Sequence, residues 1–237
     1  MVCSTLFILA LPRSLTVSAC IRQEVLGRLH AQGLQTTLLP FNTPQSQPHI
    51  PILTSSNIST AKRLVILFYE HTQDLGILAH RTLGGTGGIN KGSCVNLVKA
   101  IQTLPDPPAI LIANTGQLMF NRRHHRAMTL TSWLALPRKS AVGQPPRFDP
   151  KKNTVEHNRN TKEHISYIMD VVVPTLCNVD VKIDIIAVSD SATEIVTYLN
   201  QNIDNYEQKL ESLALCAPFH SLLDITNPNF ATWLEKV

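Results

Sequence analysis

The chain has 237 residues, 43% of them hydrophobic and 16% charged, which is enough length and apolar content for a folded core. It contains no uninterrupted run of ~20 apolar residues, so we expect no membrane span, and its net charge of +4 permits an anionic partner without requiring one. The five cysteines are scattered without a CxxC pair, which favours free thiols over disulfides, and we expect no metal and no cofactor.

The N-terminus carries an apolar run over residues 2–11. No Lys or Arg precedes this run, and Pro12 and Arg13 interrupt it. A signal peptide needs a basic start and an unbroken apolar core. We therefore expect residues 1–20 to be a buried segment or a start outside the folded domain, and not a secretion signal.

The next part of the chain begins with a helix over residues 21–32. Val25, Leu26 and Leu29 fall on one face of this helix, and Gly33 is a typical stop. Residues 34–60 are rich in Pro, Gln, Ser and Thr. This composition predicts a strand near 37–39 followed by an extended loop.

From residue 64 onward, buried strands alternate with helices. Continuous apolar runs predict strands at 64–69, 109–113, 181–188 and 213–216. Helical periodicity predicts helices at 94–101, 161–177, 192–203 and 229–236. This alternation predicts an α/β fold with a mostly parallel sheet flanked by helices. Because ligands of such sheets bind beyond the carboxyl ends of the strands, the loops after the four predicted strands are where a site is expected.

The loop after the third of these strands has the sequence Ala-Val-Ser-Asp-Ser over residues 187–191. The nucleophile elbow of α/β-hydrolases has a serine between small residues at a strand-to-helix turn. Ser189 occupies that position, although alanine and serine replace both glycines of the elbow. The alternative, which we favour, is that Ser191 and Glu194 form a capping box at the start of the helix.

A nucleophilic Ser189 would also need an acid and a histidine, which follow the serine in that order along an α/β-hydrolase chain. His220 is the only histidine after Ser189, and Asp224 follows it in the reversed order. The strands that carry the acid and the histidine would lie beyond residue 237. We therefore expect an α/β-hydrolase-like layout that is truncated at its C-terminus and lacks a complete triad.

A glycine-rich stretch, residues 84–88, precedes the predicted helix at 94–101. Backbone N–H groups at a helix start can bind an anion, so Gly85, Gly87, Gly88 and Lys91 are candidates for an anion site. The spacing matches neither a dinucleotide-binding loop nor a Walker loop. A flexible turn without a ligand is the favoured alternative.

A polar and basic excursion covers residues 117–159. Residues 117–163 hold ten Lys or Arg against three Asp or Glu. Loops of this length are usually functional or disordered. A basic loop can contact RNA or an acidic protein surface, and the alternative is a solvated insertion with no binding role. The candidate contact residues are Arg122, Arg123, Arg126, Lys151 and Lys152.

Several stretches together are similar to one known domain family. They are residues 64–70, 72–79, 84–93, 113–118 and 184–187. The chain over 21–237 resembles fungal proteins of the argonaute-binding-protein-two domain family. The same domain is found at the C-terminus of some class II histone deacetylases. The segment 72–93 is the most specific part of the resemblance.

The resemblance implies an α/β-hydrolase-like domain that serves protein association without catalysis. It implies argonaute or chromatin-silencing proteins as partners, in small-RNA-directed heterochromatin formation or in histone deacetylase complexes, within the nucleus or the cytoplasm. Some relatives have the elbow Ala-His-Ser-Tyr-Gly, whereas residues 187–191 here lack its histidine and its glycine. A serine hydrolase of the esterase type that uses Ser189 is the alternative.

Overall fold

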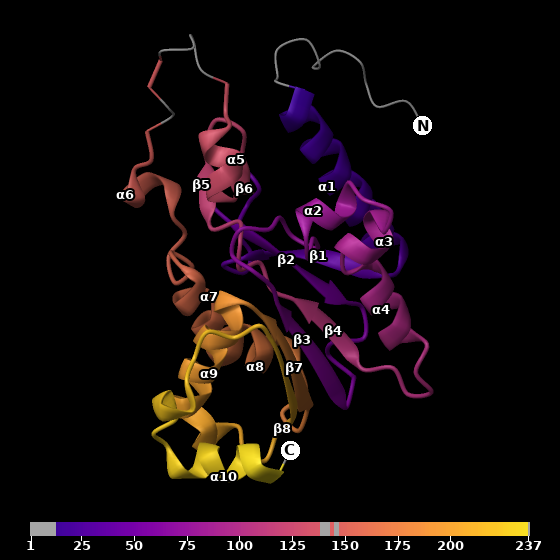
Figure 1. Cartoon of the computed structure of the whole chain (residues 1–237), viewed down its shortest axis with the longest axis vertical. Helices are drawn as coiled ribbons and strands as arrows, with labels where there is room; N and C mark the ends of the chain where they lie inside the picture. Colours follow the sequence, from indigo (N-terminus) through magenta and orange to yellow (C-terminus); the bar gives the residue numbers. More distant parts are fainter. Residues whose placement is uncertain (1–12, 138–142, 145–146, 237) are drawn as a thin grey trace.

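A six-stranded sheet forms the centre of the molecule (Figure 1). The structure, a computed structural model, describes residues 13–137, 143–144 and 147–236, so the apolar run at 2–11 lies outside the described residues. The strands follow the order β1-β2-β4-β3-β7-β8. Their bounds are β1 (Leu34–Leu39), β2 (Ile50–Ser55), β3 (Arg63–Phe68), β4 (Ala109–Ile112), β7 (Lys182–Val188) and β8 (Leu210–Cys216).

The last four strands of that order are mutually parallel, whereas β2 is antiparallel to both β1 and β4. The predicted α/β class with a mostly parallel sheet is therefore confirmed. Strand β3 lies inside the sheet and is apolar on both faces. Leu64, Ile66 and Phe68 belong to the core on one face, and Leu67 and Tyr69 belong to the core on the other.

Helices cover both faces of the sheet (Figure 1). One face packs against α1 (Arg13–Ala31), α4 (Val95–Gln102) and the short helices α2 (His80–Leu83) and α3 (Gly88–Gly92). The other face packs against α7 (Thr161–Tyr167), the π-helical turn η2 (Ile168–Val172), α8 (Val173–Leu176), α9 (Asp190–Asn202), the 3₁₀ turn η3 (Ile203–Asn205) and α10 (Pro228–Lys236). No helix within the described ranges combines the length and the apolar character that a membrane crossing requires.

The described residues of the basic excursion, 117–137, 143–144 and 147–159, include regular secondary structure. They contain a hairpin of β5 (Met119–Asn121) and β6 (Arg126–Met128), followed by α5 (Leu130–Leu134) and α6 (Pro150–Asn153). Phe120, Leu118 and Val155 form a small core with Ile50 of β2, which fixes the hairpin to the sheet. Figure 1 shows this hairpin at the end of the molecule opposite α10.

Two elements near the N-terminus differ from the sequence predictions. The loop predicted within 34–60 contains β2, because Ile52 and Leu53 are fully buried between β1 and β4 despite the polar residues around them. The first helix begins at Arg13 instead of residue 21, so α1 extends into the N-terminal segment 1–20.

Candidate functional site

The loops that follow β3, β4 and β7 meet at the carboxyl edge of the sheet. The carbonyl oxygen of Tyr69 accepts hydrogen bonds from the hydroxyl of Thr115 and, at 2.6 Å, from the hydroxyl of Ser191. The loop after β4 passes so close to the loop after β3 that a Cβ at Gly116 would lie 2.0 Å from the carbonyl oxygen of Gln73. Three segments distant in sequence are thus held against one another.

Ser189 sits at the turn between β7 and α9 in a strained conformation. Its φ is 60° and its ψ is −128°, values that non-glycine residues rarely adopt. The N–H of Ser189 donates to the carbonyl of Cys216 at 2.8 Å, which ties the turn to the end of β8. A serine on a strained strand-to-helix turn is the conformation of a nucleophile elbow.

The predicted capping box of Ser191 and Glu194 is wrong. Helix α9 begins at Asp190, so Ser191 is its second residue and cannot be its cap. The buried hydroxyl of Ser191 donates to Tyr69 instead, and no side chain caps the helix at Ser189. The serine that we expected to stabilise the helix start therefore joins two loops.

The side chain that follows Ser189 is a carboxylate that contacts the loop after β3. In α/β-hydrolases this hole consists of the N–H of the residue after the nucleophile and an N–H of the loop after β3. Here Asp190 follows Ser189, and its carboxylate accepts a hydrogen bond at 3.3 Å from the N–H of His71 in the loop after β3. The other carboxylate oxygen lies 2.9 Å from Nδ1 of His71. The backbone N–H of His71 therefore already donates a hydrogen bond within the protein.

His220 does not complete a triad. It makes no hydrogen bond to Ser189, and its Nδ1 is buried without a partner. The neighbouring Phe219 N–H donates to the hydroxyl of Thr193 in α9, at 2.9 Å. Asp224 forms a capping box with Ser221 at the 3₁₀ turn η4 (Leu222–Asp224) and is not paired with His220. No complete triad exists among the described residues.

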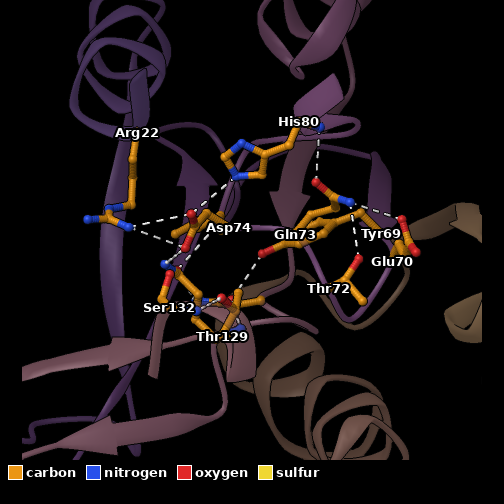
Figure 2. A network of polar contacts seen from close by, with 12 residues as sticks. Arg22, Tyr69, Glu70, Thr72, Gln73, Asp74, His80, Thr129 and Ser132 are labelled. Carbon is orange, nitrogen blue, oxygen red and sulfur yellow. Dashed lines mark hydrogen bonds and ion pairs between the residues drawn. The ribbon is translucent and has the colours of Figure 1, made fainter. Parts of the chain in front are cut away.

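A buried carboxylate, Asp74, lies at the centre of a polar network in the loop after β3 (Figure 2). Asp74 is only 3% exposed. Nη1 of Arg22 lies 3.4 Å from both of its oxygens, His80 Nε2 lies 3.3 Å from one, and Gln117 Nε2 donates to the other at 2.7 Å. Burial raises the pKa of Asp74, but the bonds to His80 and Gln117 and the charge of Arg22 hold that pKa below its ordinary value.

The network continues inward through Asn114. The side-chain oxygen of Asn114 accepts from the hydroxyl of Tyr69 at 3.0 Å and from the N–H of Gln117 at 2.9 Å. The backbone N–H of Asn114 donates to Nε2 of His164 at 3.0 Å, and Nδ1 of His164 lies 2.6 Å from the side-chain oxygen of Asn158. Burial lowers the pKa of His164 to about 3, so this imidazole is neutral.

The sequence reasoning assigned no role to Asp74, Asn114 or Gln117. These residues fall within the stretches 72–79 and 113–118, where the family resemblance is carried. That resemblance was the only signal for them, because neither stretch contains a recognisable catalytic motif.

A pocket of about 700 Å³ opens beside Asp74. Its polar wall comes from the loop after β3, from α2 and from the segment at α5. The lining includes Glu70, Gln73, Asp74, His80, Thr129 and Ser132, six residues that Figure 2 shows gathered around the network. The pocket lies beside the loop after β3, one of the four loops named in the sequence analysis.

The sequence model of the Arb2 domain matches residues 13–237. The chain belongs to the Arb2 domain family. Its strand order, with the elbow serine after β7, makes this Arb2 domain α/β-hydrolase-like. No curated protein matches the chain.

Several solved structures are similar to this Arb2 domain at low identity. Esterase LipW from Mycobacterium marinum is 11% identical with a TM-score of 0.41, over 86% of this chain and 50% of that one. An esterase from Rhizomucor miehei is 8% identical with a TM-score of 0.39, over 92% and 59%. An arylesterase is 14% identical with a TM-score of 0.35, over 90% and 60%. The Arb2 domain thus spans between half and three fifths of the length of these enzymes.

The glycine-rich stretch of the Arb2 domain does not present a free anion cradle. The N–H groups of Gly85, Gly88 and Lys91 donate to the carbonyls of Thr82, Gly85 and Gly87, respectively. The side chain of Lys91 lies over Gly87, where a Cβ would meet it at 2.8 Å. The stretch therefore connects α2 to α3 as two tight turns.

The five basic candidates of the Arb2 domain lie in two environments. Arg122, Arg123, Lys151 and Lys152 are exposed on the hairpin and α6, and Arg122 Nε donates to the carbonyl of Lys152 at 2.8 Å. Arg126 is half-buried, and its charge interacts with those of Arg22 and Asp74. Within the described ranges, no three His, Cys, Asp or Glu side chains are grouped so that they could hold a metal ion.

Proposed function

We propose that this Arb2 domain is a non-catalytic protein-interaction domain of the nucleus or cytoplasm. Its proposed partners are argonaute or chromatin-silencing proteins, in small-RNA-directed heterochromatin formation or in histone deacetylase complexes. One observation supports the absence of catalysis in this proposal. The carboxylate of Asp190 accepts a hydrogen bond from the N–H of His71, in the loop that would supply a donor of an oxyanion hole. The family match supports the interaction role.

A carboxylate at this position opposes acyl transfer. The tetrahedral intermediate of such a reaction carries a negative charge that free N–H donors must stabilise. Two like charges about 4 Å apart repel by roughly 1 to 4 kcal/mol between bulk water and a protein surface. The carboxylate of Asp190 therefore disfavours the tetrahedral intermediate. It also accepts the hydrogen bond of the His71 N–H, which is then not free to stabilise that intermediate.

An apolar surface beyond β8 is the proposed contact for a partner. Phe219, Leu222 and Leu223 are 75%, 82% and 88% exposed, and they follow strand β8, which among the described residues pairs only with β7. A cluster of exposed apolar residues next to an unpaired strand edge is typical of a protein interface. We call these three residues the apolar patch.

The experiment is affinity purification of the tagged protein from its own cells, followed by mass spectrometry for argonaute and deacetylase subunits. We expect Leu222→Ser combined with Leu223→Ser to lose those partners. Val179→Ser is the matched control, because Val179 is also 73% exposed but lies before β7, away from the apolar patch. Recovery of neither class of partner by the unmodified protein would refute the silencing role, and equal recovery by both variants would refute the patch.

A serine hydrolase is the second candidate, and the backbone strain at Ser189 is the observation that favours it. This function predicts labelling by a fluorophosphonate probe that Ser189→Ala abolishes. We expect no labelling of the unmodified protein. Replacing the carboxylate in Asp190→Asn tests the reason for that inactivity, because a labelled Asp190→Asn protein would show that the carboxylate alone blocks the serine.

A further inference from the structure

We propose that the turn of the β5–β6 hairpin and the adjacent helix α6 bind the phosphate backbone of a double-stranded nucleic acid. The contact residues are four exposed cations, which we call the basic surface: Arg122, Arg123, Lys151 and Lys152. This surface is separate from the apolar patch and does not depend on the proposed protein partners. The proposal rests on the clustering of the four side chains, on how few carboxylates neutralise them and on the polar character of the surface around them.

The fold brings together cations from two segments of the chain. Arg122 and Arg123 lie in the hairpin turn, whereas the two lysines belong to α6. Nε of Arg122 donates to the carbonyl of Lys152, 30 positions later, at 2.8 Å, and Nδ2 of Asn153 donates to the carbonyl of Phe120 at 3.0 Å. These two hydrogen bonds hold α6 beside the hairpin (Figure 1), so the two pairs of cations share one surface.

The hairpin turn carries its arginines on an ordered backbone. The side-chain oxygen of Asn121 accepts hydrogen bonds from the backbone N–H groups of Arg123 and His124, each at 3.0 Å. The preceding residue, Phe120, is fully buried in the small core that includes Ile50. A surface that is ordered before binding loses less conformational entropy when it binds. The turn is therefore suited to a ligand that contacts several charges at once.

Few carboxylates neutralise the basic surface. Asp149, at the start of α6, lies 3.7 Å from Nζ of Lys152 and accepts a hydrogen bond from the backbone N–H of Lys151. The side chains of Arg123 and Lys151 make no ion pair with another described residue, whereas an exposed arginine elsewhere, Arg28, pairs with a carboxylate. Most of the positive charge is therefore available to a ligand.

The positive charge also acts on the neighbouring imidazole of His124. Burial lowers the pKa of His124, and the charges of Arg126 and Arg123 lower it further. Like charges therefore crowd this hairpin. A polyanion that binds here reduces their mutual repulsion.

The types of residue favour a duplex over a protein or a single strand. A protein interface typically has an apolar centre, but none of the large apolar side chains that are exposed in the described chain belongs to the hairpin or to α6. Single strands stack their bases on exposed aromatic rings, but Phe120 is fully buried and Phe148 packs edge-to-face against Trp133. A duplex presents phosphates on its outside, and arginine and lysine bind them without stacking.

The experiment measures fluorescence anisotropy of a labelled RNA duplex, and of the DNA duplex of the same sequence, during titration with the full chain. Each phosphate that a cation neutralises contributes about −0.9 to the slope of log K against log salt. Four contacts therefore predict a slope of about −3.6, which is a roughly 150-fold loss of affinity between about 50 and 200 mM NaCl. We expect a Kd on the order of 10 µM or below at the lower salt concentration.

The test variant combines Arg123→Gln with Lys151→Gln. It removes two phosphate contacts, so binding should weaken at least about 10-fold and the slope should become less steep by about 2. The control combines Lys62→Gln with Lys99→Gln, which removes the same charge from two exposed lysines outside the basic surface and should keep the slope. The double serine variant of the apolar patch should also keep it. Melting followed by circular dichroism checks that each variant is folded.

Similar affinities for the two duplexes are expected, because both present a phosphate backbone, and tighter binding of one would identify it as the ligand. No binding of either duplex by the unmodified protein would overturn the proposal. An equal loss of affinity in the two charge variants would also overturn it, because general charge would then explain the binding. Binding of poly-glutamate without binding of a duplex would assign the basic surface to an acidic protein and would equally overturn it.

Discussion

The buried imidazole of His164 should make the stability of this domain fall as the pH drops below about 6.5. The folded protein keeps this ring neutral, because the N–H of Asn114 donates to Nε2 and the side-chain oxygen of Asn158 accepts from Nδ1. Burial holds the pKa of the ring at about 3. In the unfolded chain the pKa of histidine returns to about 6.5.

The direction of the effect follows from proton binding. Between these two pKa values the unfolded chain binds a proton that the folded domain does not, so acid favours unfolding. The contribution is fully present above pH 6.5 and is lost as the pH falls toward 3. At pH 5 the loss relative to pH 8 amounts to about 2 kcal/mol. The carboxylate of Asp74, whose pKa is also lowered, adds to the loss only at more acidic pH.

The assay is urea unfolding followed by circular dichroism at several pH values from 5 to 8, for the unmodified protein and for His164→Gln. The variant should be less stable at pH 8 by about 1 to 3 kcal/mol, because buried hydrogen-bonding groups lose their partner. It should also lack the 2 kcal/mol decline that the unmodified protein shows. His157→Gln is the control, because His157 is exposed. Parallel pH profiles for His164→Gln and the unmodified protein would refute the assignment of a neutral buried imidazole.

Gly116→Ala should destabilise the domain by more than 2 kcal/mol, because the added Cβ would lie 2.0 Å from the Gln73 carbonyl and force two loops apart. The control is Gly27→Ala in α1, where no atom lies within 4 Å of the new Cβ, and it should leave stability unchanged or raise it by roughly 0.5–1 kcal/mol. Urea unfolding measures both variants. Equal effects of the two substitutions would contradict the close approach of Gly116 to the Gln73 carbonyl. The thiol of Cys94, buried and with its pKa raised to about 12, should resist maleimide in the native protein at pH 7.5, whereas the exposed Cys216 should react. Peptide mapping by mass spectrometry checks this, and modification of Cys94 without denaturant would contradict its burial.

Local sequence was sufficient for most of the fold. The continuous apolar runs predicted β3, β4 and β7 because a strand that is buried on both faces has no polar face. The run at 213–216 also predicted β8, although β8 lies at the edge of the sheet and several of its residues are exposed. Local sequence was insufficient for β2, because Pro51 and the surrounding polar residues are not typical of a strand. The burial of β2 comes from its neighbours β1 and β4. The β5–β6 hairpin within the basic excursion was not predicted for a similar reason, because Phe120 and Val155 become a core only when they pack on Ile50.

The pattern of apolar residues is enough to place Ser189 between the third predicted strand and the following helix. The surroundings of that serine depend on how the loops come together in the folded domain. The carboxylate of Asp190 meets an N–H from a loop 119 positions earlier in the chain, and Arg22 meets Asp74 across 52 positions. Local patterns cannot encode such pairs, because the sheet topology alone determines which loops share an edge. The position of Ser189 is therefore a feature of the sequence, whereas the contact between Asp190 and His71 and the pocket beside Asp74 are features of the fold.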